Sequence, residues 1–352
     1  MTALALDAMG SDLGPEVAVE GAARVSLETN GPSVILVGDR AVLEPLLAAH
    51  PHESSRLSVV HAAGTVPMDA DPRAALSSID DPSIVAAARL VREGAAGALV
   101  SAGNTGAVTL ACARHFGRLP GVNRCALGAV FPTERRRGEK NDPFSLILDA
   151  GLTLDVDAED LVGFAVMGSA YAARVSSNPR PRVALLSNGA ESHKGTASVV
   201  EANRLLSRLT CIDFIGNVEG MDIPRGTADV VVTGGFTGNI VLKMLEGVAE
   251  TVMRLGRYAM DKSIFYKAGL ALLSPAVKKL RRVTDWEQYG GAPILGFDRL
   301  CIKAHGRSSA RAIANALKVA HKATRTDIIA AIREGVAEAG QAGAAEPDGG
   351  RV

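Results

Sequence analysis

Short apolar runs alternate with longer amphipathic segments along most of this chain, and that alternation limits its possible folds more than any other feature. Runs of this length with few polar residues are typical of strands that are buried on both faces. The segments between them repeat their apolar residues at helical spacing. The predicted strands are Ala3–Asp7, Val34–Gly38, Leu57–Ala62, Ala98–Ser101, Ala126–Phe131, Ser145–Asp149, Val183–Leu186, Phe214–Asn217 and Val230–Thr233. The predicted helices are Pro15–Leu27, Ala41–Ala49, Ser83–Arg92, Thr105–Phe116, Ala158–Val175 and Ser198–Leu209.

Strands that alternate with helices predict an α/β fold, in which helices cover both faces of a mainly parallel sheet. We expect a single Rossmann-like, three-layer α/β/α catalytic domain over residues 1–335, with a helical excursion over residues 254–286 near the C-terminal third. Residues 340–352 are rich in glycine, alanine and polar residues and lack apolar periodicity, so we expect a disordered tail there. In such sheets ligands bind beyond the carboxyl ends of the strands.

The composition excludes several classes of protein. Acidic and basic residues balance at 38 each, so no overall field favours nucleic acid, and we expect no nucleic-acid partner. The four cysteines are widely spaced and mostly flanked by apolar residues, which favours reduced thiols in the core. We find neither a signal-peptide pattern nor an apolar run near the roughly 18 residues that span a bilayer. We therefore expect a cytoplasmic protein.

Four glycine-rich loops follow predicted strands: Leu6–Pro15, Val100–Ala107, Ser187–Thr196 and Thr233–Asn239. Glycine with Asn or Thr at the start of a helix suits an anion, because unpaired backbone N–H groups and the helix dipole favour negative charge there. Two such loops at neighbouring strand ends would hold a phosphate and a developing oxyanion together. The alternative is that Asn104, Thr105, Thr237 and Asn239 only cap helices.

The familiar nucleotide and hydrolase motifs are missing. No G-x-G-x-x-G follows Leu6, and Lys194-Gly195-Thr196 reverses the Gly-Lys order of a P-loop. No G-x-S-x-G or H-E-x-x-H pattern occurs either. We therefore expect no bound metal and no organic cofactor.

Taken together, seven stretches resemble the bacterial acyl-ACP:phosphate acyltransferases, the phosphate acyltransferases of phospholipid synthesis. They keep the order of that family and cover nearly the whole chain. The stretches are Ala5–Gly10, Val100–Ala107, Phe164–Ser169, Gly216–Gly220, Gly235–Asn239, Tyr289–Pro293 and Ala304–Gly306. The sequence departs from the usual pattern at Gly234, where the family usually has Asp, and at Ser192–His193, but Lys194 and Asn239 are in place.

The resemblance implies a reaction and partners. Inorganic phosphate would attack the thioester of acyl carrier protein and give an acyl phosphate, which a downstream membrane acyltransferase would use. The resemblance also implies a homodimer with a Rossmann-like fold. Two alternatives stay open at this point: a phosphate acyltransferase that uses acyl-coenzyme A, and a non-catalytic scaffold that binds carrier protein or membrane.

The chemistry of this reaction assigns roles to residues. Lys194, the movable positive charge in a glycine-rich loop, would bind phosphate or the tetrahedral intermediate, with a solvated surface lysine as the alternative. Asn239 would donate an amide N–H to phosphate or the oxyanion, with a place near a helix cap as the alternative. His305 would orient the site or donate a proton, although a structural histidine fits the sequence equally well. The remaining candidates would line the phosphate and acyl site, with Asp7 fixing loop geometry rather than acting as a base. They are Asp7, Gly10, Gly103, Asn104, Thr105, Gly106, Asn217, Glu219, Gly235, Thr237 and Gly238.

Residues 263–283 combine apolar side chains with a basic end at Lys278, Lys279, Arg281 and Arg282. This composition suits peripheral contact with the inner face of the cell membrane or with acidic carrier protein. It suits a helical hairpin at a dimer interface equally well.

Overall fold

The computed structural model describes residues 2–137, 142–261 and 290–344. The strands are β1 Ala3–Asp7, β2 Val34–Gly38, β3 Leu57–His61, β4 Ala96–Ser101, β5 Ala126–Arg137, β6 Asp142–Leu148, β7 Arg182–Leu186, β8 Asp213–Val218, β9 Val230–Val232, β10 Ala292–Leu295 and β11 Leu300–Lys303. The helices are α1 Pro15–Ser26, α2 Arg40–Ala48, α3 Pro72–Ser78, α4 Ser83–Arg92, α5 Thr105–His115, α6 Ala158–Val175, α7 Ala197–Leu206, α8 Asp222–Arg225, α9 Gly235–Asp261, α11 Ala310–Arg325 and α12 Ile328–Ala344. The α/β prediction is confirmed.

The strands of the described residues form one sheet of 11 strands, in the order β3-β2-β1-β4-β11-β10-β5-β6-β9-β7-β8. Most neighbouring strands are parallel, but the direction changes in the middle of the sheet. There β10 is antiparallel to both β11 and β5, and β5 is antiparallel to β6. Strands β6 to β10 therefore run opposite to the other strands.

This reversal decides where the glycine-rich loops lie. The loops after β1 and β4 follow strands of one direction, whereas the loops after β7 and β9 follow strands of the other. The rule for parallel sheets therefore does not bring all four glycine-rich loops to one edge. It brings them together as two pairs.

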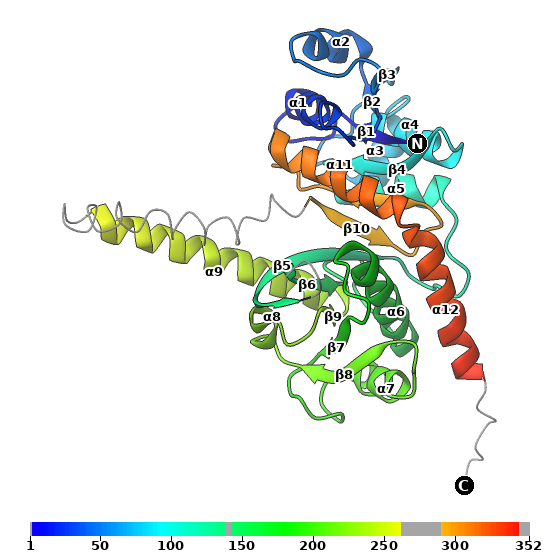
Figure 1. Cartoon of the computed structure of the whole chain (residues 1–352), viewed down its shortest axis with the longest axis vertical. Coiled ribbons are helices and arrows are strands. Elements are labelled where there is room, and N and C mark those ends of the chain that lie inside the picture. The colour runs from blue at the N-terminus through cyan, green and yellow to red at the C-terminus, as the bar shows by residue number, and fades with distance from the viewer. Residues whose placement is uncertain (1, 138–141, 262–289, 345–352) are drawn as a thin grey trace.

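Helices cover both faces of the sheet, as predicted. One continuous core joins α1, α11 and α12 to α6 and α7 on one face. On the other face, α3, α4 and α5 cover the half that contains β1 and β4, and α8 and α9 cover the half that contains β6 and β9. Figure 1 shows these halves as two lobes, with α9 leaving the body of the molecule between them.

Local sequence explains where the helices that border the site begin. The side chain of Asn104 accepts the backbone N–H of Ala107 and so caps α5. At α6, Asp157 and Asp160 form a reciprocal capping box. Each cap fixes the loop that precedes its helix.

Two predicted segments lie partly outside the described residues. Helix α9 contains residues 254–261 of the predicted helical excursion, and residues 262–289 are not described, which includes the basic stretch of the sequence analysis. Helix α12 ends at Ala344, so residues 340–344 are helical rather than part of a disordered tail.

Candidate active site

Asp7, at the end of β1, is the buried centre of the first pair of loops. Its Oδ1 accepts the hydroxyl of Ser83 at 2.7 Å, and its Oδ2 accepts the hydroxyl of Ser101 at 2.6 Å. The Ser101 hydroxyl oxygen in turn accepts the backbone N–H of Gly103 at 3.0 Å. Burial raises the pKa of the Asp7 carboxyl, and these hydrogen bonds together with the charge of Lys303 oppose that shift. Asp7 is therefore joined through Ser101 to the loop after β4.

The two loops of this pair touch through glycine. A Cβ on Gly10 would lie 2.7 Å from the Asp7 Oδ2 and 2.7 Å from the Cα of Gly103. No side chain fits at that separation. Glycine at position 10 is therefore required by packing, and both Gly10 and Gly103 are buried.

Asn104, Thr105 and Gly106 form the start of α5. Besides capping the helix, the Asn104 amide donates to the carbonyl oxygens of Met68 at 2.9 Å and Ala70 at 3.2 Å. The Asn104 side chain therefore holds the segment before α3 against α5. The groups that α5 offers an anion are the backbone N–H groups of Thr105 and Gly106, since the Asn104 side chain already takes the N–H of Ala107.

Lys303, which sequence reasoning missed, lies at the end of β11 beside this cluster. The residue is only 6% exposed, and its ammonium donates to the carbonyl oxygen of Ala304. Burial lowers the pKa of the Lys303 ammonium to about 8, against the opposing charges of Cys301, Asp7 and Asp12. Its burial at a strand end, within reach of the charges of Asp7 and Asp12, makes Lys303 a candidate site residue that the sequence alone did not reveal.

Asp149, directly after β6, is the corresponding centre of the other half, and it too was missed as a site residue. It is fully buried and accepts the backbone N–H groups of Leu127, Gly151, Leu152 and Thr153 at 2.7–3.1 Å. The Thr153 hydroxyl donates to the Asp149 Oδ2 at 2.9 Å. The same hydroxyl oxygen accepts the backbone N–H of Gly235 at 3.0 Å. Asp149 and Thr153 thus fix the first residue of α9.

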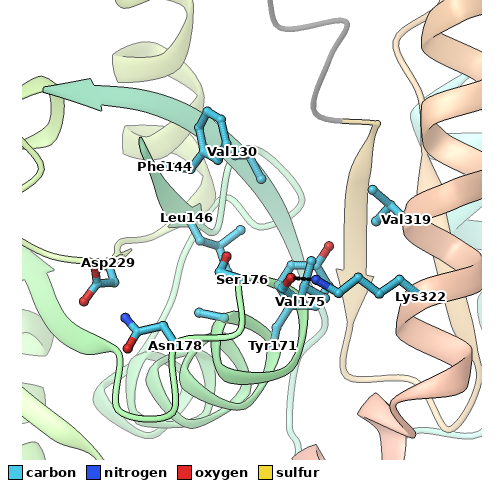
Figure 2. A pocket seen from close by; sticks show the side chains of 11 residues that line it. Val130, Phe144, Leu146, Tyr171, Val175, Ser176, Asn178, Asp229, Val319 and Lys322 are labelled. Atoms are coloured by element: carbon cyan, nitrogen blue, oxygen red, sulfur yellow. Dashed lines mark hydrogen bonds between the residues drawn. The ribbon is translucent and has the colours of Figure 1, made fainter. Parts of the chain in front are cut away.

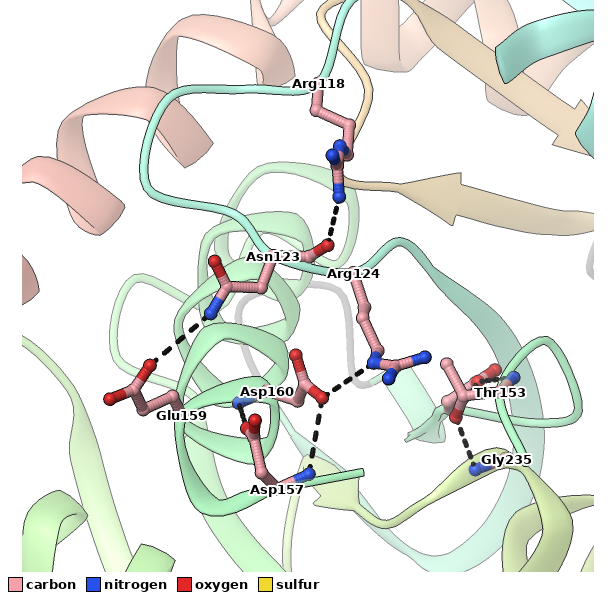
Figure 3. Close-up of polar contacts among 9 residues, drawn as sticks. Arg118, Asn123, Arg124, Thr153, Asp157, Glu159, Asp160 and Gly235 are labelled. Carbon is pink, nitrogen blue, oxygen red and sulfur yellow. Dashed lines mark hydrogen bonds and ion pairs between the residues drawn. The ribbon is translucent and has the colours of Figure 1, made fainter. Parts of the chain in front are cut away.

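The other end of this loop is fixed by the start of α6. The guanidinium of Arg124 lies 2.9 Å from the Asp160 carboxylate, which also belongs to the capping box of α6. Figure 3 shows this pair next to the Thr153–Gly235 hydrogen bond. The segment from Asp149 to Asp157 is therefore held at both ends beside α9.

The first turn of α9 packs tightly on this loop through glycine. A Cβ on Gly238 would lie 1.9 Å from the carbonyl oxygen of Asp149. Gly151 has a φ of 136°, and a Cβ there would lie 3.4 Å from the Asn239 Oδ1. Thr237 and Asn239 are exposed, and the Asn239 amide has no hydrogen bond to any described residue. Asn239 is therefore available to a ligand rather than used as a cap.

Lys194 lies in the loop after β7, the strand next to β9. The two strands are parallel, with Leu185 opposite Val232, so the loops with Lys194 and Asn239 leave the sheet at the same edge. The Asn217 amide donates to the carbonyl oxygens of Glu191 at 2.9 Å and Lys194 at 3.4 Å. Asn217, itself bound by the Asn203 amide at 2.9 Å, thus shapes the Lys194 loop, and its side chain is buried.

Two further candidates lie at the margins of this arrangement. Lys194 is exposed, and no ion pair joins its ammonium to the described residues. The backbone N–H of Glu219 donates to the Asp222 Oδ2 at 3.0 Å.

His305 connects the two halves. It follows β11 and is close enough to α9 that the charge of Lys243 acts on its ring. Partial burial first, and then the charges of Lys243 and Lys303, lower the pKa of the His305 imidazole. The ring is therefore neutral at neutral pH. Its Nδ1 accepts the backbone N–H of Arg307 at 3.1 Å.

The structure therefore groups the predicted site residues into two clusters. Asp7, Gly10, Gly103 and Asn104 form the first, and Gly235, Gly238, Asn239 and the Lys194 loop share an edge of the second. Among the described residues, no hydrogen bond joins the Asn104 cluster to either Lys194 or Asn239. His305 is the predicted residue that lies between the two halves.

Comparison with known proteins gives the chain a family. Residues 2–331 match the model of a family described as fatty acid synthesis protein. A phosphate acyltransferase from Myxococcus xanthus is 46% identical over 319 residues, which are 90% of this chain and 88% of that protein. A phosphate acyltransferase from Elusimicrobium minutum is 42% identical over 336 residues, which are 95% and 96% of the two chains.

Solved structures share the fold at lower identity. A phosphotransacetylase from Streptococcus pyogenes has a TM-score of 0.60 and 17% identity, over 92% of this chain and 94% of that chain. A branched-chain phosphotransacylase from Enterococcus faecalis has a TM-score of 0.52 and 15% identity, over 91% and 99% of the two chains. The chain therefore belongs to the fatty acid synthesis protein family, among its phosphate acyltransferases, and is an acyltransferase enzyme.

Proposed function

We propose that the enzyme moves a fatty acyl group from the thioester of acyl carrier protein to inorganic phosphate and releases an acyl phosphate for phospholipid synthesis. One observation carries the proposal. The Thr153 hydroxyl donates to Asp149 and accepts the backbone N–H of Gly235, and these two hydrogen bonds, which we call the Asp149–Thr153 bracket, fix the start of α9 beside the loop that bears Lys194. The N–H groups of Phe236 and Thr237 have no intrahelical acceptor, so they and the helix dipole favour an anion there. Inorganic phosphate is the anion that this reaction requires.

The proposed acyl transfer requires mainly that the enzyme hold phosphate beside the thioester carbonyl. A phosphate oxygen attacks the thioester carbonyl carbon, a C–O bond forms, and the C–S bond breaks with departure of the carrier thiolate, which then takes up a proton. Phosphate is largely ionised at neutral pH, and a thiol with a pKa of about 8.5 is a good leaving group. Because no enzyme nucleophile is needed, fixing the anion and stabilising the oxyanion account for most of the catalysis.

The named residues divide this work. The exposed ammonium of Lys194 approaches the anion from the neighbouring strand end, and the Asn239 amide donates to phosphate or to the oxyanion. We assign His305 to orienting the site: its Nδ1 is held by the backbone N–H of Arg307, and its lowered pKa leaves the ring neutral, so the departing thiolate takes its proton from water. Asp7 acts indirectly, through Ser101 and the loop after β4.

The test is incubation of the purified enzyme with acyl-acyl carrier protein and radiolabelled phosphate, followed by identification of the labelled product. We expect label in an acyl phosphate and release of one carrier thiol per product. Parallel reactions with acyl-coenzyme A identify the donor. Turnover of the coenzyme A thioester alone would contradict the proposed donor, and thiol release without phosphate incorporation would contradict phosphate as the acceptor.

We also infer that the exposed apolar row on α9 is covered in the working enzyme. Phe236, Ile240, Met244, Val248 and Val252 recur at helical spacing along α9, and each is more than half exposed. In Figure 1 this helix extends well beyond the body of the molecule. No helix among the described residues is both long and apolar enough to cross a membrane. A second copy of the chain is the partner that we propose for this row, with a membrane surface as the alternative outcome.

A further inference from the structure

Three polar side chains form a row across the carboxyl ends of β1, β4 and β11. In the registers of these parallel strands, Asp7 lies opposite Ser101, and Ser101 lies opposite Lys303. Residues opposite one another in neighbouring strands point to the same face of a sheet. This face is the one that α4 and α5 cover, because Cys301, two residues before Lys303, belongs to the core on that side. Lys303 is therefore the cationic end of a row whose other end is the Asp7 carboxylate.

The side chain of Lys303 fixes the direction in which the chain leaves β11. Lys303 is only 6% exposed, and its ammonium donates to the carbonyl oxygen of Ala304. A buried lysine is rare, because its charge loses the solvation of water. A hydrogen bond from a charged donor is roughly twice as strong as one from a neutral donor. The charged side chain therefore holds the peptide group that leads into His305.

The other side of His305 is held by the loop after β1. The carbonyl oxygen of Gly306 accepts the backbone N–H of Asp12 at 2.9 Å and the hydroxyl of Ser11 at 3.2 Å. A Cβ on Gly306 would lie 2.4 Å from the Asp12 Oδ2, so the two loops are in close contact. The position of His305 therefore depends on Lys303 on one side and on the loop after β1 on the other.

We propose that Lys303 is a positioning residue for acyl transfer, whose buried ammonium holds the peptide group before His305 and so keeps the His305 ring between the two halves of the molecule. This role rests on the proposed function, in which His305 orients the site. Lys303 does not contact the substrates in this role and acts through His305. Its charge, and not only its volume, is therefore required for full activity.

The charge of Lys303 is present at neutral pH and is lost in alkaline solution. Burial lowers the pKa of the Lys303 ammonium to about 8, whereas the charges of Cys301, Asp7 and Asp12 favour the ammonium. His305 also faces Lys303, and its own lowered pKa leaves its ring neutral at and above neutral pH. Because the charged form holds the Ala304 carbonyl more strongly, positioning should be nearly complete at about pH 7 and should be lost as the pH rises through about 8.

The pH dependence of kcat/KM tests this role, because it reports the titration of groups in the free enzyme. With acyl-acyl carrier protein as the varied substrate, wild-type kcat/KM should fall about tenfold between about pH 7 and about pH 9. Lys303→Met has a side chain of similar length without the charge, so it should show the low value already at about pH 7 and should not decline further. Identical profiles for the wild type and Lys303→Met would overturn the proposal.

Lys322→Met is the matched control. Lys322, on α11, also donates its ammonium to a carbonyl oxygen, that of Val175 at the end of α6. Figure 2 shows this bond at the edge of a cavity that both halves of the molecule line. The substitution removes a lysine-to-carbonyl bond of the same kind without changing the contacts of His305. Lys322→Met should therefore keep the wild-type pH profile, and loss of its alkaline decline would overturn the assignment to Lys303.

A substitution at Asp12 shifts the titration and leaves Lys303 unchanged. Asp12→Asn removes a charge that favours the ammonium, but it keeps the backbone N–H that bonds to Gly306. The alkaline decline of kcat/KM should therefore begin at a lower pH in Asp12→Asn than in the wild type. Because Asp12 is exposed, this variant also tests the proposal where Lys303→Met fails to fold. A decline at the wild-type pH would assign the titration to another group and overturn the proposal.

Hydrogen exchange distinguishes a failure of this proposal from a failure of the proposed function, because it needs no substrate. Peptides that cover residues 300–310 should exchange faster in Lys303→Met than in the wild type at about pH 7. Peptides of β2 should exchange equally in both proteins, which shows that the variant is folded. Unchanged exchange in residues 300–310 would overturn the positioning role. A wild type that shows no phosphate-dependent turnover would instead contradict the proposed function, and with it the effect of Lys303 on acyl transfer.

Discussion

At the scale of single residues, Lys194 and Asn239 carry the proposed chemistry because each offers a polar group that the described part of the protein leaves unused. Lys194→Ala and Asn239→Ala should each reduce turnover with acyl-acyl carrier protein and phosphate by roughly tenfold to a thousandfold, the scale of a lost oxyanion donor. Steady-state kinetics measure the turnover of each variant, and circular dichroism confirms that each variant is folded. Lys318→Ala, an exposed lysine on α11, is the control and should keep full activity. Full activity in both site variants would remove these residues from the mechanism.

Lys303 makes a prediction about pH. Its folded-state pKa is lowered to about 8 from an ordinary value of 10.5, so between these values the unfolded chain binds more protons than the folded one. Stability from this group should therefore rise with pH across that window, by at most about 1.4 kcal/mol per pH unit. Urea denaturation of wild type and Lys303→Met at pH 7 to 10 isolates the effect. The free energy of unfolding of the wild type should increase relative to the variant as the pH rises, and parallel curves would contradict the assignment.

The sequence predicted some of these residues and not others, for physical reasons. Lys194 and Asn239 stand in glycine-rich loops, which local composition reveals. Asp149 ends an apolar run and looked like the last residue of a strand, because nothing local shows that four backbone N–H groups converge on it. Lys303 ends the run Leu300–Lys303, and its burial depends on neighbours from β1 and the loop after it. The contacts of Asp149 and Lys303 come from segments that are distant in sequence, and a single sequence does not show which distant segments come together.

At the scale of elements, the start of α9 depends on a hydroxyl from another segment. Thr153→Val keeps the volume of the side chain but leaves the buried N–H of Gly235 without its acceptor. We expect a loss of roughly 1–3 kcal/mol in the free energy of unfolding, together with a higher KM for phosphate. Thr324→Val is the control, because its hydroxyl only bonds back to Ala320 in the same helix at 2.7 Å. Equal denaturation midpoints for the two variants would contradict the role of the bracket.

Strand prediction succeeded where a run is apolar enough to show its pattern. The runs at β1 and β2 were predicted with their observed bounds. The three-residue β9 was predicted because it consists of three valines, whereas β10 and β11, of four residues each, contain a proline and a lysine and were not predicted. These two strands lie where the two halves of the sheet join.

At the scale of the whole molecule, the exposed row on α9 predicts self-association. Met244→Glu should shift the protein from dimer to monomer in sedimentation velocity, because it places a charge among apolar side chains. Glu250→Gln, on the same helix, should leave the dimer intact. A wild-type monomer that instead floats with anionic lipid vesicles would assign the row to a membrane, and unchanged dimers in Met244→Glu would place the interface elsewhere.

The account depends most on an inorganic anion at the start of α9, next to Lys194. A crystal structure of the enzyme soaked with arsenate, an analogue of phosphate, locates that anion through the anomalous signal of arsenic. We predict an arsenic peak whose oxygens lie about 2.7–3.2 Å from the backbone nitrogens of α9's first turn and the Asn239 amide. An arsenic peak found only elsewhere in the molecule would contradict the account.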